Sequence, residues 1–210
     1  MRVDGSVRVL IDGVNHDIEK GGKLPEGQLT LLTINLDGCE KATDDGRDYL
    51  RGLNRLRSFT INSGSQIRNF DFLADMVNLE VLSSEGGPPC LWDKDLIHIK
   101  GLTNLRTLQL TAQFGNPELT DKALEMVKEL KKLETLRLAC CNISDAGLRY
   151  LEGHGSLRTL DFWNTKISDT GLESLATLPK LDALYLQDTQ VTDAGVKSIQ
   201  AKIPNCKIIK

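Results

Sequence analysis

The sequence predicts an α/β solenoid, in which short parallel strands form a curved sheet and helices cover its outer side. The segments that begin at Leu133, Leu157 and Leu181 align with one another, with successive starts 24 residues apart. Each segment begins with alternating apolar residues and continues with apolar residues at helical spacing. A fixed repeat of this length is typical of solenoids, because each unit buries its apolar face only against its neighbours.

The first half of each repeat predicts a strand. Leu136 and Leu138 alternate with polar residues, and Leu184 and Leu186 do the same two repeats later. This period of two is typical of a strand with one buried face. Successive strands joined by a crossing helix run parallel, so the strands should form one curved parallel sheet.

The second half of each repeat predicts a helix. It opens with a hydroxyl residue followed by aspartate, where the hydroxyl can cap free amides and the carboxylate can favour the helix dipole. Leucines three residues apart then form an apolar stripe on one helix face. The helix starts are Ser144-Asp145, Ser168-Asp169 and Thr192-Asp193, and the stripes are Leu148 with Leu151 and Leu172 with Leu175.

Four earlier repeats start at Leu31, Leu56, Leu79 and Leu105. The second (NSGSQIRNFDFL) lacks the hydroxyl-aspartate pair and the third replaces it with GGPPC, so short helices or irregular turns are expected there. The predicted organisation is an N-terminal cap or degenerate repeat over residues 1–30, seven repeats over 31–205, and a C-terminal capping strand over 206–210. The segment VRVLI, from Val7 to Ile11, is a candidate strand within that first part.

The pattern LxxLxLxx(C/T/N)x(I/V)(T/S)DxGLxxL resembles the leucine-rich repeat, in particular the cysteine-containing class and the TDxGL repeats of bacterial proteins. The resemblance covers roughly residues 31–210. It implies a leucine-rich-repeat solenoid that serves as a binding scaffold, usually for proteins, on its concave sheet face.

Candidate binding residues follow when each repeat is numbered from its first leucine, with positions 1, 4 and 6 in the core and positions 3, 5 and 7 on the concave face. Trp163 then lies at position 7 beside Tyr185, and Arg137 and Asp161 are neighbours at position 5. These residues form either a binding hot spot or a surface without a binding role. In the second case Trp163 folds over its neighbours, and Arg137 and Asp161 form a weak surface ion pair. The predicted concave site comprises Trp163, Tyr185, Arg137, Asp161, Gln187, Gln109 and Glu85.

A second candidate site is a lip of two loops. Repeats three and four are lengthened just after their strands, over residues 85–92 and 111–119, and adjacent insertions stack on one edge. This lip carries Phe114 and Trp92 and could hold a ligand. The alternative is neutral insertion, with Trp92 buried beneath the loop.

Composition excludes several function classes. The 210 residues carry a net charge of −3 without a basic block, which argues against nucleic acid as a partner. No apolar run approaches the roughly 18 residues of a membrane span. The histidines His16, His98 and His154 have no metal-ligand spacing with cysteines or carboxylates, and no phosphate-binding loop is present. We therefore expect no metal, no cofactor and no enzymatic activity.

The five cysteines suggest a location. Cys39 and Cys141 share position 9 but lie four strands apart, roughly 19 Å, well beyond the reach of a disulfide. An odd count without matching pairs predicts reduced thiols and hence the cytoplasm.

These observations predict a non-catalytic scaffold that binds another protein through its concave face. A first alternative is the substrate-recognition domain of a larger protein, such as a ubiquitin-ligase adaptor or a bacterial effector. A second is a structural or small-ligand-binding repeat protein that uses the lip.

Overall fold

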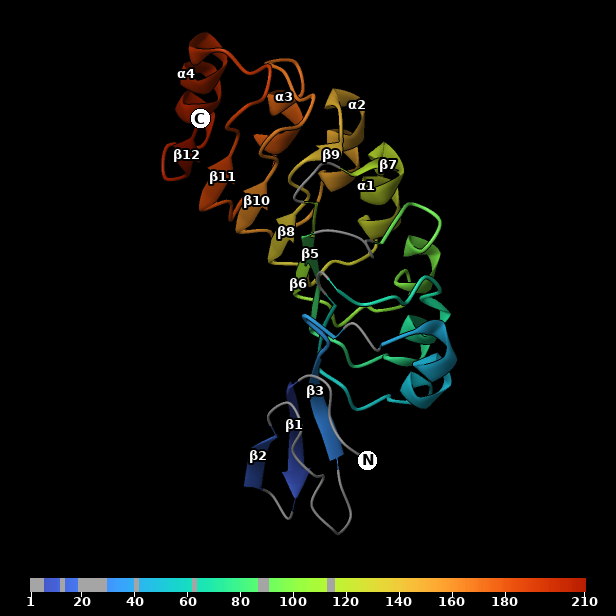
Figure 1. Ribbon diagram of the computed structural model, residues 1–210. Helices are drawn as coiled ribbons and strands as arrows, with labels where there is room; N and C mark the ends of the chain where they lie inside the picture. Colours follow the sequence, from blue (N-terminus) through green and yellow to red (C-terminus); the bar gives the residue numbers. More distant parts are fainter. Residues whose placement is uncertain are drawn as a thin grey trace.

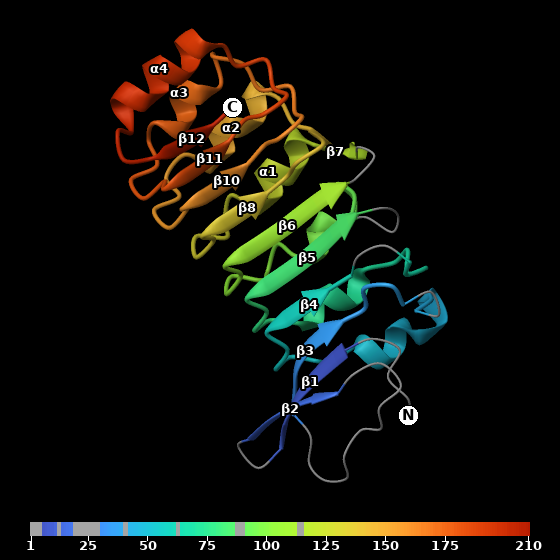
Figure 2. The same cartoon turned by 60° about the vertical axis from the view of Figure 1, so that its left-hand side comes forward.

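A computed structural model describes residues 6–11, 14–18, 30–39, 42–61, 64–86, 91–112 and 116–210. Its strands follow the inner side of an arc and its helices follow the outer side (Figures 1 and 2). The main sheet has ten strands in the order β12-β11-β10-β8-β6-β5-β4-β3-β1-β2. The predicted α/β solenoid is confirmed.

The repeats supply seven parallel strands and the C-terminal capping strand β12 an eighth, and equivalent positions of neighbouring repeats pair in register. Leu136 of one repeat pairs with Leu160 of the next, which in turn pairs with Leu184. Most of these strands are three residues long and end at position 5. They are β3 (Thr30–Asn35), β4 (Ser58–Thr60), β5 (Val81–Gly86), β6 (Thr107–Ala112), β8 (Thr135–Arg137), β10 (Thr159–Asp161), β11 (Ala183–Tyr185) and β12 (Lys207–Ile209).

The N-terminal end of the sheet differs in strand direction. The strand expected at Val7–Ile11 is present as β1 (Ser6–Ile11), and β2 (Val14–Ile18) pairs with it in a hairpin. β1 also pairs with β3, and both of these pairings are antiparallel. A hairpin, and not a further parallel repeat, therefore lies against the first repeat strand.

The outer side changes from short 3-10 helices to α-helices along the chain. The first three repeats have η1 (Asp44–Leu50), η2 (Asp71–Asp75) and η3 (Leu96–His98). Later repeats have α1 (Asp121–Val127), α2 (Asp145–Leu148) with η4 (Arg149–Leu151), α3 (Leu172–Leu175) and α4 (Asp193–Lys202). A small parallel pair, β7 (Asn116–Thr120) and β9 (Cys141–Asn142), lies apart from the main sheet. The second and third repeats thus carry short helices, as their divergent sequences predict.

The core consists of positions 4 and 6 of the strands packed against the leucines of the helices. Phe59, Ile61, Leu82, Leu108, Leu110, Leu136, Leu138, Leu160, Phe162, Leu184 and Leu186 are all buried. The predicted helix stripes, Leu148 with Leu151 and Leu172 with Leu175, are buried as well. Alternation and helical spacing therefore converge on one continuous core, which fixes the odd strand positions on the opposite face of the sheet.

Ser84 is the exception at position 6. It is 2% exposed in β5, and its hydroxyl has no hydrogen-bond partner. A buried hydroxyl without a partner costs about 1–3 kcal/mol, so we expect Ser84→Ala to raise the free energy of unfolding by about 1 kcal/mol. Urea denaturation would measure the change. Ser58→Ala, at a half-buried strand position, should leave stability nearly unchanged, and a loss of stability in Ser84→Ala would contradict this account.

A tight turn follows the strand in several repeats. Position 8 has a positive φ in Gly38 (66°), Cys140 (59°), Asn164 (52°) and Asp188 (56°). Glycine, asparagine and aspartate are the residues that tolerate this left-handed conformation best. The turn directs the chain from the sheet toward the helix and places the preceding residue, such as Trp163, at the rim of the concave face.

Candidate functional site

The repeated aspartates hold each repeat to the next one. The Asp121 carboxylate accepts hydrogen bonds from the backbone N–H and the hydroxyl of Ser144, at 2.8 and 2.6 Å. Asp145 binds Ser168 in the same way at 2.8 and 2.6 Å, and Asp169 binds Thr192 at 2.7 and 2.6 Å. We call this set, together with Asp93 and Asp44, the aspartate ladder.

The glycine of the TDxGL pattern has a steric reason. A Cβ atom built on Gly171 would lie 2.4 Å from Asp145 Oδ1, and one on Gly147 would lie 2.5 Å from Asp121 Oδ1. On Gly195 the distance to Asp169 Oδ1 would be 2.0 Å. These contacts are shorter than van der Waals separations, so a larger residue at these three positions would have to displace the ladder carboxylate. The fourth repeat, which receives Asp93, has Ala123 at the equivalent position.

The ladder gives these aspartates a role beyond the helix starts predicted from the sequence. Asp121, Asp145 and Asp193 lie in the first turn of their helices as predicted, whereas α3 begins only at Leu172, after Asp169. Thr120 and Thr192 do cap their helices, accepting from Lys122 N at 3.4 Å and Gly195 N at 3.1 Å. Ser144, however, makes no side-chain cap hydrogen bond. Hydrogen bonds from Thr192 lower the pKa of the Asp169 carboxyl, which keeps this residue ionised as an acceptor. The aspartates are therefore structural acceptors between repeats, which the spacing within one repeat could not reveal.

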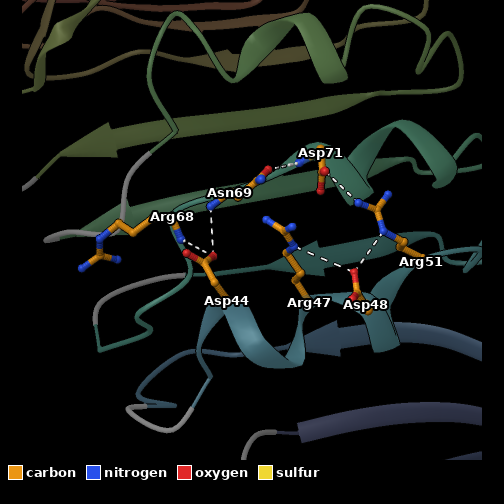
Figure 3. A network of polar contacts seen from close by, with 7 residues as sticks. All are labelled: Asp44, Arg47, Asp48, Arg51, Arg68, Asn69 and Asp71. Atoms are coloured by element: carbon orange, nitrogen blue, oxygen red, sulfur yellow. Dashed lines mark hydrogen bonds and ion pairs between the residues drawn. The ribbon is translucent and has the colours of Figure 1, made fainter.

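The ladder has a gap between the second and third repeats. Asp44 accepts from the backbone N–H groups of Arg68 and Asn69, at 2.8 and 3.1 Å (Figure 3). Asn69, which takes the ladder position of the second repeat, instead accepts from the backbone N–H of Asp71 at 3.0 Å. Asp93 resumes the pattern by binding Thr120 N at 2.9 Å.

Charged side chains reinforce the first two repeats on the outer side. Arg51 donates to Asp48 at 3.2 Å and to Asp71 at 2.7 Å, so it joins η1 to η2 (Figure 3). The hydrogen bond to Asp71 is the main cause of a raised pKa of Arg51. Exposed ion pairs of this kind contribute little to stability. Because Arg51, Asp48 and Asp71 already bind one another, we assign these three residues a structural role and not a binding role.

The concave face carries a row of position-5 side chains in register across the sheet. Gln109 of β6 pairs with Arg137 of β8, Arg137 with Asp161 of β10, and Asp161 with Tyr185 of β11. All four side chains are half-buried, between fully buried residues at positions 4 and 6. Neighbouring strands lie about 4.8 Å apart, so these side chains form one continuous polar and aromatic strip, which we call the position-5 row.

The ion pair between Arg137 and Asp161, which belonged to the alternative interpretation, is absent from this row. Arg137 and Asp161 are in register, yet no N–O distance between them is within 4.0 Å in the part of the chain that the structure describes. The Asp161 carboxylate instead accepts from the backbone N–H of Trp163 at 3.1 Å. One oxygen of the Asp161 carboxylate is therefore used within the turn after β10. The interpretation of Arg137 and Asp161 as a surface ion pair is wrong.

Trp163 lies at the rim and not within the strand. It follows β10 in the turn, is 42% exposed, and its indole Nε1 donates to Asp188 Oδ2 of the next repeat at 2.7 Å. This contact agrees with the alternative in which the ring leans over its neighbours. The hydrogen bond also holds an exposed aromatic ring in a fixed position beside the position-5 row.

The remaining predicted concave residues are arranged less distinctively. Gln187, after β11, has a buried Oε1 without a hydrogen-bond partner. Glu85 lies within β5 and is half-buried, as is Gln109 in β6. Gln109 belongs to the position-5 row through its pairing with Arg137, and Glu85 lies on the next strand toward the N-terminus, β5.

Trp92, one residue of the predicted lip, is not buried beneath a loop. It is 37% exposed, and Lys94 Nζ lies 4.8 Å from its ring centroid. An open depression of about 470 Å³ adjoins it, lined by residues of the third and fourth repeats: Trp92, Asp93, Lys94, Pro117, Glu118, Thr120 and Lys122. Phe114, the other residue of the predicted lip, lies outside the described residues.

Groups with chemical reactivity do not converge in the described parts of the chain. Within them, no three His, Cys, Asp or Glu side chains are placed to hold a metal ion. His16 is exposed on β2, His98 ends η3, and His154 is fully buried. Cys140 and Cys206 are buried free thiols, and Cys39 and Cys141 are buried as well. None of the helices within the described ranges has the length and apolar character of a membrane span.

Comparison with known proteins identifies the repeats. A profile described as Leucine Rich repeat matches residues 129–151 and 156–176, which contain Leu136, Asp145 and the turn at Trp163. Together with the parallel sheet and its register, this match decides the assignment. Residues 129–176 carry leucine-rich repeats, and the chain has the fold of a leucine-rich-repeat solenoid. The finer likeness to cysteine-containing, TDxGL-type repeats remains a prediction from the sequence.

Solved structures of leucine-rich repeat proteins share this fold. Internalin C2 from Listeria monocytogenes is similar with a TM-score of 0.59 and 24% identity, over 86% of this chain and 68% of that one. A second internalin from the same organism has a TM-score of 0.54 and 20% identity, over 75% and 48% of the two chains. A leucine-rich repeat protein from Leptospira interrogans has a TM-score of 0.53 and 16% identity, over 78% and 39%. A search of curated protein sequences finds no significant match.

Proposed function

We propose that this leucine-rich-repeat solenoid is a non-catalytic scaffold that binds a protein partner through the C-terminal part of its concave face. The position-5 row is the observation that carries the proposal. It places Arg137, Asp161 and Tyr185 side by side on three adjacent strands, with Trp163 held at its rim. Trp, Tyr and Arg are the residues that contribute most strongly to protein interfaces.

The rigidity of this surface supports the proposal. Positions 4 and 6 of β8, β10 and β11 are buried, and the aspartate ladder fixes the outer side of the same repeats. A binding surface on fixed strands loses little conformational entropy when a partner binds. The alternatives are a recognition domain within a longer protein, which would use this same face, and a small-ligand site at the depression beside Trp92.

Location and chemistry belong to the same proposal. Buried free thiols at Cys140 and Cys206 are consistent with a reducing compartment, and we propose the cytoplasm. We propose no metal and no cofactor, and neither nucleic acid nor membrane as a partner.

The test is selection of binding peptides from a random 12-residue display library on the immobilised full chain, followed by titration of the selected peptides. We expect Trp163→Ala combined with Tyr185→Ala to weaken their binding at least tenfold, or about 1.4 kcal/mol. Trp92→Ala removes the other half-exposed tryptophan and should leave binding unchanged. Peptides that bind the double variant as tightly as the wild type would refute the proposed site, and loss only in Trp92→Ala would favour the site beside Trp92.

A further inference from the structure

Arg137 differs from the other arginines of the repeats in having no polar partner. Between residues 30 and 210, within the described ranges, every other arginine side chain makes a hydrogen bond or an ion pair. These are Arg47, Arg51, Arg55, Arg57, Arg68, Arg106, Arg149 and Arg158. Arg137 makes neither, and its Nε is buried without a partner. A guanidinium without a partner in the chain keeps its hydrogen-bonding capacity for an acceptor outside it.

The position of Arg137 makes this guanidinium accessible. It lies at position 5 of β8, on the concave side, and its side chain is half-buried. Of its guanidinium nitrogens only Nε is buried and unpaired, so the terminal nitrogens remain open to solvent. The backbone of β8 and the buried leucines on either side hold the base of the side chain in place.

The nearest acid within the row does not serve as its partner. Asp161 is in register with Arg137 but accepts from the Trp163 N–H at 3.1 Å. The guanidinium therefore keeps its capacity for two parallel hydrogen bonds to a planar anion, which is the arrangement that arginine makes with carboxylates.

We propose that Arg137 binds a single carboxylate of the partner protein, from an aspartate, a glutamate or a chain end, and so anchors the partner beside Tyr185 and Trp163. This inference rests on the proposed function, since it names the chemistry of the partner at the same face. A single guanidinium next to the Asp161 carboxylate matches one negative charge. Asp161 would repel a doubly charged phosphate more strongly than a singly charged carboxylate.

The test uses the peptides selected on the wild-type chain and a double-mutant cycle. For each peptide, every Asp or Glu is changed in turn to Asn or Gln, and binding is measured to the wild type, Arg137→Gln and Arg137→Lys. We expect one such amide change to weaken binding to the wild type about tenfold and to have no further effect on Arg137→Gln. Arg137→Lys should retain part of the affinity, because lysine keeps the charge without the paired geometry.

The control is Arg158→Gln, which removes an arginine that already pairs with Asp182 at 2.8 Å; it should leave peptide binding unchanged. Arg137→Gln should keep the melting temperature of the wild type, because the side chain has no partner to lose. A phosphoserine that binds better than glutamate at the coupled position would overturn the inference in favour of a phosphopeptide. Binding that requires Trp163 and Tyr185 but shows no coupling to Arg137 would overturn the carboxylate anchor alone and leave the proposed function standing.

Discussion

Asp145→Ala is expected to destabilise the chain by about 2–3 kcal/mol, because it leaves the N–H and hydroxyl of Ser168 without their acceptor in a partly buried contact. Gly171→Ala should cost a similar amount for a different reason. The added Cβ would meet Asp145 Oδ1 at 2.4 Å and Leu148 Cδ1 at 2.9 Å. Urea denaturation of both single variants would measure these changes.

The double variant, Asp145→Ala with Gly171→Ala, distinguishes the ladder from independent effects. Removing the Asp145 carboxylate also removes the atom that the new Cβ would meet. The free energy of unfolding of the double variant should therefore fall by clearly less than the sum of the two single decreases. Gly155→Ala is the matched control, since a Cβ there has no atom within 4 Å, and it should be nearly neutral. Strict additivity of the two changes would show that Gly171 and Asp145 do not act as one contact.

Stability should fall as pH is lowered from about 6.5 to about 4, because of His154. Its side chain is fully buried, and neither ring nitrogen makes a hydrogen bond of normal geometry. Burial and the nearby charge of Lys131 lower the pKa of His154 from 6.5 to about 4, while the backbone of Lys128 and the charge of Glu129 oppose the shift. In this window the unfolded chain binds a proton that the folded chain does not.

The size of the effect follows from linkage. The contribution of His154 to the free energy of unfolding is fully present above pH 6.5. It is lost progressively as pH falls toward 4, by roughly 3 kcal/mol at most. Denaturation curves at successive pH values should therefore show a free energy of unfolding that falls with pH between 6.5 and 4. We expect His154→Leu to remove this pH dependence. His16→Gln, at an exposed position, should leave it in place. An unchanged pH dependence in His154→Leu would contradict the assignment. Lowered carboxyl pKa values such as that of Asp169 add a separate loss of stability, which begins near pH 5 and grows as pH falls further.

The fold could be predicted from the sequence because each repeat restates the same pattern. Leu136 and Leu138 mark a strand, Leu148 and Leu151 mark a helix face, and both pairs are buried as expected. The departures in the second and third repeats also had a visible signal, since NSGSQIRNFDFL and the GGPPC segment lack the hydroxyl-aspartate pair. The antiparallel hairpin of β1 and β2 had no such signal, because neither strand repeats the pattern.

The details of the candidate site depended on contacts between repeats. Asp145 contacts Ser168 across 23 residues, and Trp163 contacts Asp188 across 25. A motif examined within one repeat shows a helix start and an exposed aromatic residue, but not these partners. An alignment of each repeat with the next one in register would have placed Trp163 at position 7 next to Asp188 at position 8. The free guanidinium of Arg137 could not be predicted, because its neighbour Asp161 is the acid that the sequence offers as a partner.

The most direct test of the central claim is to map a selected peptide onto the labelled full chain by backbone NMR. Binding through the concave face predicts chemical-shift changes concentrated at Thr135–Arg137, Thr159–Asp161 and Ala183–Tyr185 and at the Trp163 indole, with little change along α2, α3 and α4. Changes concentrated on those helices, or around Trp92, with β8, β10 and β11 unaffected, would contradict the claim.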